Sequence, residues 1–347
     1  MQSQEGRGNP ALFFVPGVRQ SMDGVTLVHR TDLHLSDEPP ASRTDDWAST
    51  CIDKLAQIGE IARATRAAAV IDTADFFHLK SPSRNSHSLV QRAADVHLTY
   101  PCPVYSNIGN HDVKYGAMEF LSESPLGVLF SSGVFHRLYD EHEAVFEGGG
   151  IKVRVVGIPY HGTKYDMNRL TSLVKGDEDY LVVSAHLLAS PGGGTMFEAE
   201  DIVKYSDLAN MAPDVWCFGH WHKNQGIREV ATGKWVVNLG SLTRGSLTQD
   251  EMNRTPSVAV MDFSKRGVAI REVQLRVTPA KDVFDVAGRQ RMEARTASVD
   301  ALVDNIRVTV ASRAEGSLLE AVRASADVPS HVKERTLSYL EAATRAR

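Results

Sequence analysis

Five short polar clusters, each placed directly after a short apolar run, constrain the fold of this 347-residue chain more than any other feature. The clearest is Gly-Asn-His-Asp at residues 109–112, which follows the mostly apolar run 103–108. Glycine permits a tight turn, and the asparagine amide offers a neutral oxygen ligand for a cation. The histidine can exchange a proton near neutral pH, and a neighbouring aspartate can fix its ring. The cluster indicates a metal-binding or proton-transferring site at the tip of a buried strand.

The first half of the chain predicts strands that alternate with helices. Strands are expected at residues 25–30, 67–73 and 103–108. Apolar residues at near-helical spacing from Trp47 onward predict one helix, with Thr44 as its N-cap, and a second helix is expected at about 86–98. This βαβαβ order favours a parallel sheet, whose ligands gather at the carboxyl ends of the strands. One edge is therefore expected to carry the polar clusters at residues 31–34, 74–78 and 109–112.

The second half of the chain predicts a second sheet. A hairpin is expected at residues 144–147 and 151–158, and two strands at 180–185 and 215–218. These two strands end at His186 and at the Gly-His-Trp-His cluster 219–222. Further strands, expected to be antiparallel, follow at residues 235–238, 257–263 and 268–273. Two mixed sheets packed face to face, with helices outside, account for this order, so the predicted fold class is α/β (α+β).

Beyond about residue 275 the pattern changes to helices. One is expected at residues 298–311, one after a capping box formed by Ser317 and Glu320, and one at 330–343. We therefore predict an N-terminal extension (1–24), a main domain (25–275) that carries every polar cluster, and a small C-terminal cap or partner-binding region (276–347).

Composition limits the classes of protein to which the chain can belong. The formal net charge is -5, whereas a protein that binds nucleic acid unaided usually has a basic surplus. A nucleic-acid role would need a local basic face, metal ions at the site or a basic partner. Three scattered cysteines, an odd number, argue against a disulfide framework and favour a reducing cytoplasm. No apolar run approaches the roughly 20 residues that span a membrane, so no membrane association is expected.

The polar clusters together supply seven candidate metal ligands. Their donors are imidazole nitrogens, carboxylates and one amide oxygen, a mixture that suits manganese, with iron, zinc or magnesium as alternatives. Seven ligands exceed what one ion normally takes from a protein, and a bridging carboxylate would divide them into two sites of four. Two cations about 3.5–4 Å apart form a clamp for in-line displacement at phosphorus. The candidate ligands are Asp32, His34, Asp75, Asn110, His186, His220 and His222.

These clusters resemble the five motifs of calcineurin-like metallophosphoesterases, in the same order, over residues 25 to about 245. Within that superfamily, Asp75-Phe76-Phe77-His78 followed by Pro82 is similar to a stretch of the SbcD-type DNA repair exonuclease subunits. The segment Asn-Leu-Gly-Ser-Leu-Thr-Arg at residues 238–244 is also similar to theirs. The resemblance implies a four-layer αββα sandwich. Two departures are Ala74, where the family has glycine, and Arg30, where a small or apolar residue is usual.

The resemblance implies a role for each site residue. The first metal would be held by Asp32, His34, Asp75 and His222, and the second by Asp75, Asn110, His186 and His220. His111 would protonate the leaving oxygen, oriented by Asp112, and His78 would stabilise charge on the scissile phosphate. For Asp112 the alternative is a turn cap, and for His78 it is packing under the loop. DNA phosphates could be contacted by Arg244, Lys80 and Arg84, or these could be solvated surface charges.

The function expected from the resemblance is that of a manganese-dependent DNA nuclease. It would hydrolyse phosphodiester bonds at DNA ends, as an exonuclease with endonuclease activity as a second mode, in recombination or repair. The expected partners are DNA and an SbcC-type SMC-like ATPase, with a homodimer in the complex and the C-terminal helices either docking on the ATPase or packing within the chain. The location would be the cytoplasm, or the host cytoplasm for a viral protein. Alternatives are a stand-alone phosphoesterase for small nucleotides or phosphoproteins and a non-catalytic binding module, whose signature would be missing ligands.

Overall fold

The computed structural model divides the chain into two compact units, Met1–Val283 and Phe284–Arg347. It describes residues 24–78, 84–114, 118–192, 199–289, 318–326 and 328–345, together with residues 291, 296, 298 and 299. Most of the predicted N-terminal extension and of the helix at 298–311 lies outside the described residues, as do Lys80, Pro82 and Ser317.

The first sheet has the strand order β14-β13-β1-β2-β3-β4. Its parallel part confirms the predicted βαβαβ arrangement, because β1 pairs with β2 and β2 with β3 in parallel. The later strands β13 and β14 extend it in antiparallel pairing on the other side of β1. The strands are β1 (Val25–Arg30), β2 (Ala69–Asp72), β3 (Val104–Ser106), β4 (Phe135–Arg137), β13 (Ser257–Ser264) and β14 (Gly267–Gln274).

The second sheet has the strand order β11-β12-β10-β7-β6-β5. Residues 235–238 form a strand, β12, as predicted. The predicted antiparallel pairing is wrong for its contact with β10, because these two strands are parallel. The chain reverses twice between them, because β11 forms an antiparallel hairpin with β12. Strand β11 was not predicted, because its two exposed charged residues, Arg228 and Glu229, interrupt the apolar pattern. The strands are β5 (Glu143–Gly148), β6 (Ile151–Ile158), β7 (Tyr180–His186), β10 (Val215–Gly219), β11 (Gly226–Ala231) and β12 (Lys234–Asn238).

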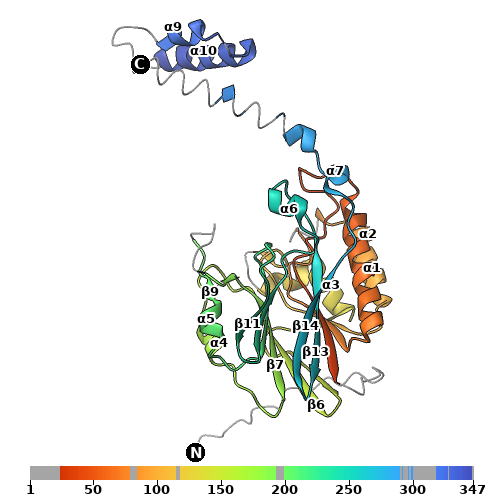
Figure 1. The fold of residues 1–347 in the computed structure, drawn as a ribbon. Coiled ribbons are helices and arrows are strands. Elements are labelled where there is room, and N and C mark those ends of the chain that lie inside the picture. The colour runs from red at the N-terminus through yellow and green to blue at the C-terminus, as the bar shows by residue number, and fades with distance from the viewer. Residues whose placement is uncertain are drawn as a thin grey trace, which may run out of the picture. The chain divides into compact units, whose positions relative to one another are not determined.

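The two sheets pack face to face around a shared apolar layer. Leu27 and Ile71 from the first sheet lie in one buried cluster with Val155 and Val182 from the second. Helices α1 and α2 cover the outer face of the first sheet, and α4 and α5 the outer face of the second (Figure 1). The result is a four-layer αββα sandwich, as expected. The helices of this unit are α1 (Trp47–Thr65), α2 (His87–Leu98), α3 (Pro125–Ser131), α4 (Asn168–Thr171), α5 (Tyr205–Leu208), α6 (Gln249–Asn253) and α7 (Ala280–Val283).

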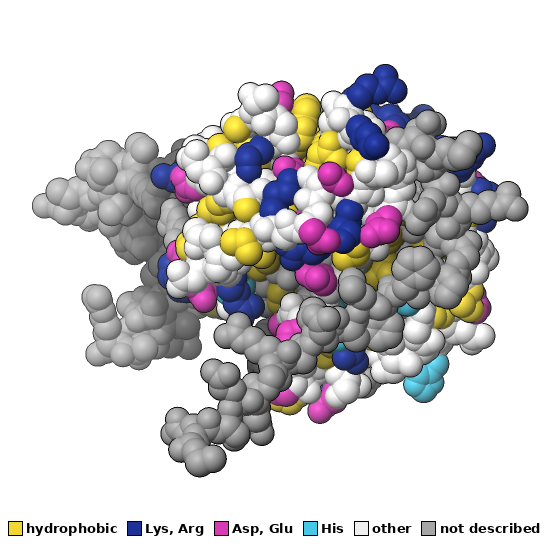
Figure 2. All heavy atoms as spheres, turned by 90° about the horizontal axis from the view of Figure 1, so that it is seen from below, with side chains coloured by type: hydrophobic (Ala, Val, Ile, Leu, Met, Phe, Trp, Pro, Cys, Tyr) yellow, Lys and Arg dark blue, Asp and Glu magenta, His cyan; other side chains and the backbone are white. Residues whose placement is uncertain are grey.

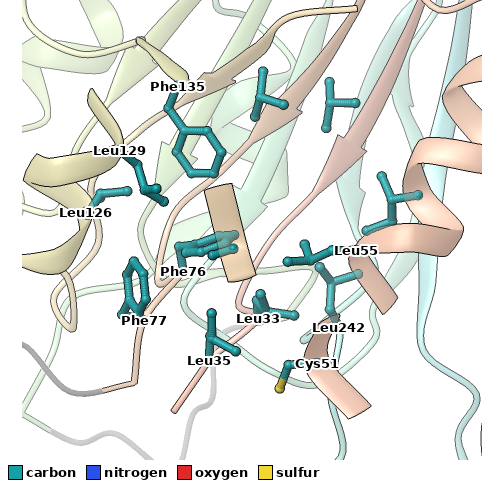
Figure 3. Packing of buried hydrophobic residues seen from close by; sticks show 14 of the residues in the cluster. Leu33, Leu35, Cys51, Leu55, Phe76, Phe77, Leu126, Leu129, Phe135 and Leu242 are labelled. Carbon is teal, nitrogen blue, oxygen red and sulfur yellow. The ribbon is translucent and has the colours of Figure 1, made fainter. Parts of the chain in front are cut away.

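Apolar packing holds the loops that follow β1 and β2 against helix α1. Leu33 and Phe76, each next to a candidate metal ligand, belong to one buried cluster with Leu55 of α1 (Figure 3). Burial of each such side chain stabilises the fold by roughly 1.5–3 kcal/mol. The polar residues of these loops are therefore presented by a firmly packed base.

Helix α1 begins two residues later than predicted. Its N-cap is Asp46, whose Oδ1 accepts a hydrogen bond from the Ser49 N–H at 3.0 Å, so the predicted N-cap Thr44 is wrong. The backbone N–H of Thr44 instead donates to the Val283 carbonyl at 3.1 Å, which holds this part of the chain outside the helix.

Short elements complete the first unit, and two helices form the described part of the second. The short elements are a 3₁₀ helix at Met118–Glu123 and a two-stranded pair of β8 (Ala189–Ser190) and β9 (Val203–Lys204). In the second unit α9 (Leu318–Ala324) contacts α10 (Ser330–Arg345), which confirms the helix predicted at 330–343. None of the described helices combines the length and apolar character that crossing a membrane requires.

Candidate metal centre

The predicted ligands meet at one edge of the sandwich, where strands of both sheets end. Asp32 and His34 follow β1, Asp75 follows β2 and Asn110 follows β3, whereas the remaining three histidines come from the ends of β7 and β10. Several of these positions have a positive φ, a conformation that costs energy and clusters at functional sites. The values are 53° at Asp32, 53° at His34, 49° at Asp75 and 82° at His220.

Hydrogen bonds hold the first two ligand loops side by side. The backbone N–H of Asp32 donates to the Ala74 carbonyl at 3.0 Å, and that of His34 donates to the Asp75 carbonyl at 3.0 Å. The small side chain of Ala74, which replaces the family's glycine, is fully buried at a φ of 89°. These backbone hydrogen bonds between the two loops therefore hold their positive-φ residues in place.

Four of the ligands form a first cluster. Asp32, His34, Asp75 and His222 each offer one ligand atom, and these atoms lie within 4.8 Å of one another. The Nε2 atoms of His34 and His222 are 2.9 Å apart, and His222 Nε2 lies 3.7 Å from Asp32 Oδ1. This is the set expected for the first metal.

The second cluster shares Asp75 with the first. Asp75, His186 and His220 again offer ligand atoms within 4.8 Å of one another. His186 Nε2 lies 3.3 Å from Asp75 Oδ2 and 3.2 Å from the amide oxygen of Asn110. The structure thus brings together all the residues expected for the second metal, with Asp75 at the junction of the two clusters.

The residues fit a pair of divalent cations. Asp75 Oδ2 is buried and has no hydrogen-bond partner, although Oδ1 of the same carboxylate accepts from the His111 N–H at 2.8 Å. A buried carboxylate oxygen without a hydrogen bond is costly, and the Nε2 atoms of His186 and His34 lie 3.3 and 3.7 Å from this one. A cation on each side of Asp75 would satisfy that oxygen and the converging nitrogens together.

The electrostatics of the site follow from burial and from close histidines. Burial and the neighbouring His222 hold the pKa of His34 well below its usual range, which keeps this imidazole neutral and able to bind a cation. Burial alone would raise the pKa of Asp75, but the His186 and His34 imidazoles lower it well below its usual range. Burial alone would lower the pKa of His186, but the Asp75 carboxylate raises it to about 10. Cation binding would therefore release a proton from His186.

The tautomer of His186 is fixed by the first sheet. Its Nδ1 lies 2.7 Å from the Thr73 carbonyl oxygen, which can only accept a hydrogen bond. Nδ1 must then carry the hydrogen, and Nε2 faces the cluster as the ligand atom.

Asp112 does not orient the ring of His111, so that prediction is wrong. Its carboxylate accepts hydrogen bonds from the backbone N–H groups of Gly109 and Asp75, both at 2.9 Å, and of Phe76 at 3.1 Å. The His111 Nδ1 faces the His78 carbonyl oxygen at 2.8 Å instead. Asp112 caps its own turn, 109–112, and not the next turn as the alternative had it, and it also ties the loop after β3 to the loop after β2.

His78 and His111 lie together beside the first cluster. Their rings stack with centroids 5.2 Å apart, and the His111 ring lies 4.8 Å from that of His34. His34, His78 and His111 also form a third group whose ligand atoms fall within 4.8 Å. His78 is exposed, so it does not pack under the loop.

Arg244 lies inside the molecule, and the prediction that it contacts DNA phosphates is not supported. It is only 6% exposed, and its guanidinium donates to the carbonyl oxygens of Thr278 at 2.5 Å and Met252 at 3.5 Å. Arg244 connects the loop after β12 to the chain that precedes α7. Arg84 is exposed.

Two groups that support the ligands are not marked by any pattern in the sequence. Glu200 lies with Oε1 3.0 Å from His220 Nε2, and a buried pair joins Arg30 to Asp72 at 2.7 Å. Glu200 follows a glycine-rich loop and no strand, so no pattern marked it. Arg30 was visible only as a departure from the family at a strand end.

The chain is similar to several solved structures and to one family profile. The structures include TT1561 of Thermus thermophilus (14% identity, TM-score 0.43, 72% of this chain and 100% of that chain covered). A dimetal phosphatase from Danio rerio is 12% identical (TM-score 0.47, 73% and 96% covered), and GAP50, the anchor in the inner membrane complex of Plasmodium, is 11% identical (TM-score 0.46, 73% and 85% covered). No curated protein matches the sequence. The profile of the calcineurin-like phosphoesterases matches residues 25–224, and the chain belongs to this family.

Proposed function

We propose that this metallophosphoesterase is a manganese-dependent DNA nuclease that hydrolyses phosphodiester bonds at DNA ends. The main support is the placement of His78. It ends the stretch Asp75-Phe76-Phe77-His78 that resembles SbcD-type nucleases, and it stacks on His111 beside the first metal cluster. His78 at this position offers the scissile phosphate a hydrogen-bond donor in addition to His111, the proposed general acid.

His111 is suited to give a proton to the leaving oxygen. Its Nδ1 hydrogen is engaged by the His78 carbonyl, which leaves Nε2 as the nitrogen that can transfer a proton. The two cations, when bound, would polarise the phosphate and acidify the attacking water. The contribution of the chain is to hold His111 in one orientation, through its backbone N–H on Asp75 Oδ1 and its ring on His78.

His78 is suited to contact the phosphate as a neutral imidazole. Partial desolvation of the ring against the site and the neighbouring His111 lower the pKa of His78 below its usual value. A neutral ring can donate one hydrogen bond to a phosphate oxygen without adding a positive charge that would repel the cations. The role proposed for His78 is therefore to stabilise the phosphate by hydrogen bonding.

Affinity for DNA is proposed to depend on the cations and on a partner. The chain has a net charge of -5. On the face shown in Figure 2, Lys and Arg of the described residues are interspersed with Asp and Glu and do not gather into one basic area. A homodimer joined to an SbcC-type SMC-like ATPase, in DNA recombination or repair, would supply a basic surface for DNA.

The proposal is tested by cleavage of end-labelled linear duplex DNA in Mn²⁺, with and without a co-purifying ATPase and ATP. The His111→Ala variant is expected to lose roughly 10²–10⁴-fold in rate, the usual contribution of a general acid. His142→Ala, which removes an exposed histidine of the loop before β5, is the matched control and should cleave like the wild type. Intact DNA together with hydrolysis of a small phosphodiester would overturn the nuclease proposal and favour a stand-alone phosphoesterase.

A further inference from the structure

Glu200 forms a hydrogen-bonded bridge to the metal centre. Its Oε1 lies 3.0 Å from His220 Nε2 and accepts from the Tyr165 hydroxyl at 2.7 Å. The Tyr165 oxygen in turn accepts from the Leu188 N–H at 2.8 Å. The side chains of Glu200 and His220 are only 10% and 14% exposed, so this bridge is largely shielded from water.

The backbone next to Glu200 is fixed to the loop that carries Tyr165. The N–H of Asp201 donates to the Thr163 carbonyl at 2.9 Å, and the Asp201 carboxylate accepts from the Tyr165 N–H at 3.0 Å. Two contacts therefore hold Glu200 in place. The hydrogen bonds of Asp201 fix the backbone next to it, and the Tyr165 hydroxyl fixes its carboxylate.

This contact decides which nitrogen of His220 can bind a cation. An ionised carboxylate accepts hydrogen bonds and donates none, so the hydrogen of the His220 ring must lie on Nε2. Nδ1 is then the nitrogen with a free lone pair. His186 has the reverse arrangement, since its Nδ1 donates to the Thr73 carbonyl and its Nε2 is left for the cation.

We propose that Glu200 is a positioning residue that sets the tautomer and orientation of His220 for the second cation. The proposal rests on the two-cation centre and does not depend on the substrate. A carboxylate raises the basicity of a hydrogen-bonded imidazole more than a carbonyl oxygen does. The affinity of His220 for a cation should therefore depend more on Glu200 than that of His186 depends on the Thr73 carbonyl.

The first test is ¹⁵N NMR of the histidine rings in the metal-free protein, with His220 assigned from a His220→Asn variant. Wild type is expected to show the hydrogen on His220 Nε2, and Glu200→Ala is expected to show a mixture of tautomers. An unchanged tautomer in Glu200→Ala would overturn the proposal. This readout needs neither metal nor DNA, so it is separate from the test of nuclease activity.

The second test is calorimetric titration with Mn²⁺. Glu200→Gln, which keeps the shape of the side chain, and Glu200→Ala are expected to weaken one of two sites by about 10–100-fold and to leave the other unchanged. Tyr165→Phe should have a smaller effect because it removes only the hydroxyl. Glu178→Gln, which alters a buried carboxylate paired with Arg154, is the matched control and should bind like the wild type.

Two results would contradict a positioning role. Wild-type affinity at both sites in Glu200→Ala would make Glu200 a purely structural residue. Complete loss of one ion, as large as in His220→Asn, would make Glu200 a direct ligand. If the predicted weakening were found but the wild type left DNA intact, the role of Glu200 would stand and the nuclease proposal would fail.

Discussion

The two sides of the metal centre are supported in different ways. The carboxylate side, Asp32 and Asp75, is almost fully buried at 0% and 1% exposure, and backbone hydrogen bonds and a strained φ fix it. The histidine arm, His220 and His222, is more open, and the His222 side chain is 48% exposed. Its described support includes the side chain of Glu200. The first sheet thus supplies a rigid base, whereas the histidine arm of the second sheet ends in a ligand, His222, that solvent can reach.

A buried ion pair lies beneath the carboxylate side. Arg30 and Asp72 are opposite each other in β1 and β2, and Arg30 also lies 2.8 Å from His97 Nε2. The second oxygen of Asp72 accepts from the Ala74 N–H at 2.9 Å, directly before the shared ligand Asp75. The unusual arginine of this chain thus connects both ligand loops of the first sheet.

The largest effect is expected where the two sides meet. Asp75→Asn keeps an oxygen for the His111 N–H but removes the negative charge shared by both clusters. Mn²⁺ titration should show loss of affinity at both sites, larger than the about 10–100-fold loss typical of a residue that only supports a ligand. Retention of one site at wild-type affinity would show that the two clusters do not share Asp75.

A smaller effect is expected from steric displacement of the carboxylate side alone. A Cβ at Gly109 would lie 2.1 Å from Asp75 Oδ1 and 2.8 Å from the Asp75 backbone nitrogen, so Gly109→Ala must move the shared ligand. Gly192→Ala, whose Cβ would meet no atom within 4 Å, is the control. We expect weaker Mn²⁺ binding for Gly109→Ala alone. Equal binding by the two variants would mean that the base is not rigid.

Loss of the buried arginine should lower stability before it changes binding. Burial raises the pKa of Asp72 against the opposing effect of Arg30, so removal of Arg30 leaves a carboxyl that is costly to ionise. Arg30→Met is expected to lower the free energy of unfolding by about 3–5 kcal/mol in urea titration. Arg276→Met, at an exposed pair with Glu60, should cost less, about 0–1 kcal/mol. Similar losses in the free energy of unfolding for both variants would show that the buried pair contributes no more than an exposed one.

The smallest effect is a pH dependence from a histidine of the rigid base. His29 is buried with Nε2 2.7 Å from Thr73 Oγ1, and burial lowers its pKa to about 3. The unfolded chain binds this proton near pH 6.5 and the folded chain does not, so stability is lost as the pH falls from about 6.5 towards 3. His29→Gln keeps a donor but cannot titrate.

The wild type should therefore lose up to about 1.4 kcal/mol more per pH unit than His29→Gln between about pH 6 and 4, measured by urea unfolding. Parallel stability curves for the two proteins would show that His29 is protonated in the folded state.

The sequence predicted the ligand set and the sandwich because both follow from local order. Each ligand comes directly after a buried strand, and parallel strands bring their ends to one edge. The partner of Asp112, the burial of Arg244 and the position of Glu200 depend on how distant loops cross, so no local pattern marked them. The direction of β12 was missed for the same reason, because the unpredicted strand β11 reverses the chain once more.

The most direct test of the shared two-cation centre is anomalous diffraction at the manganese edge from crystals grown with Mn²⁺. A shared centre should give two peaks on opposite sides of Asp75, one among Asp32, His34 and His222 and one among Asn110, His186 and His220. A single peak, or a peak held by His34, His78 and His111 in place of one of these, would contradict it.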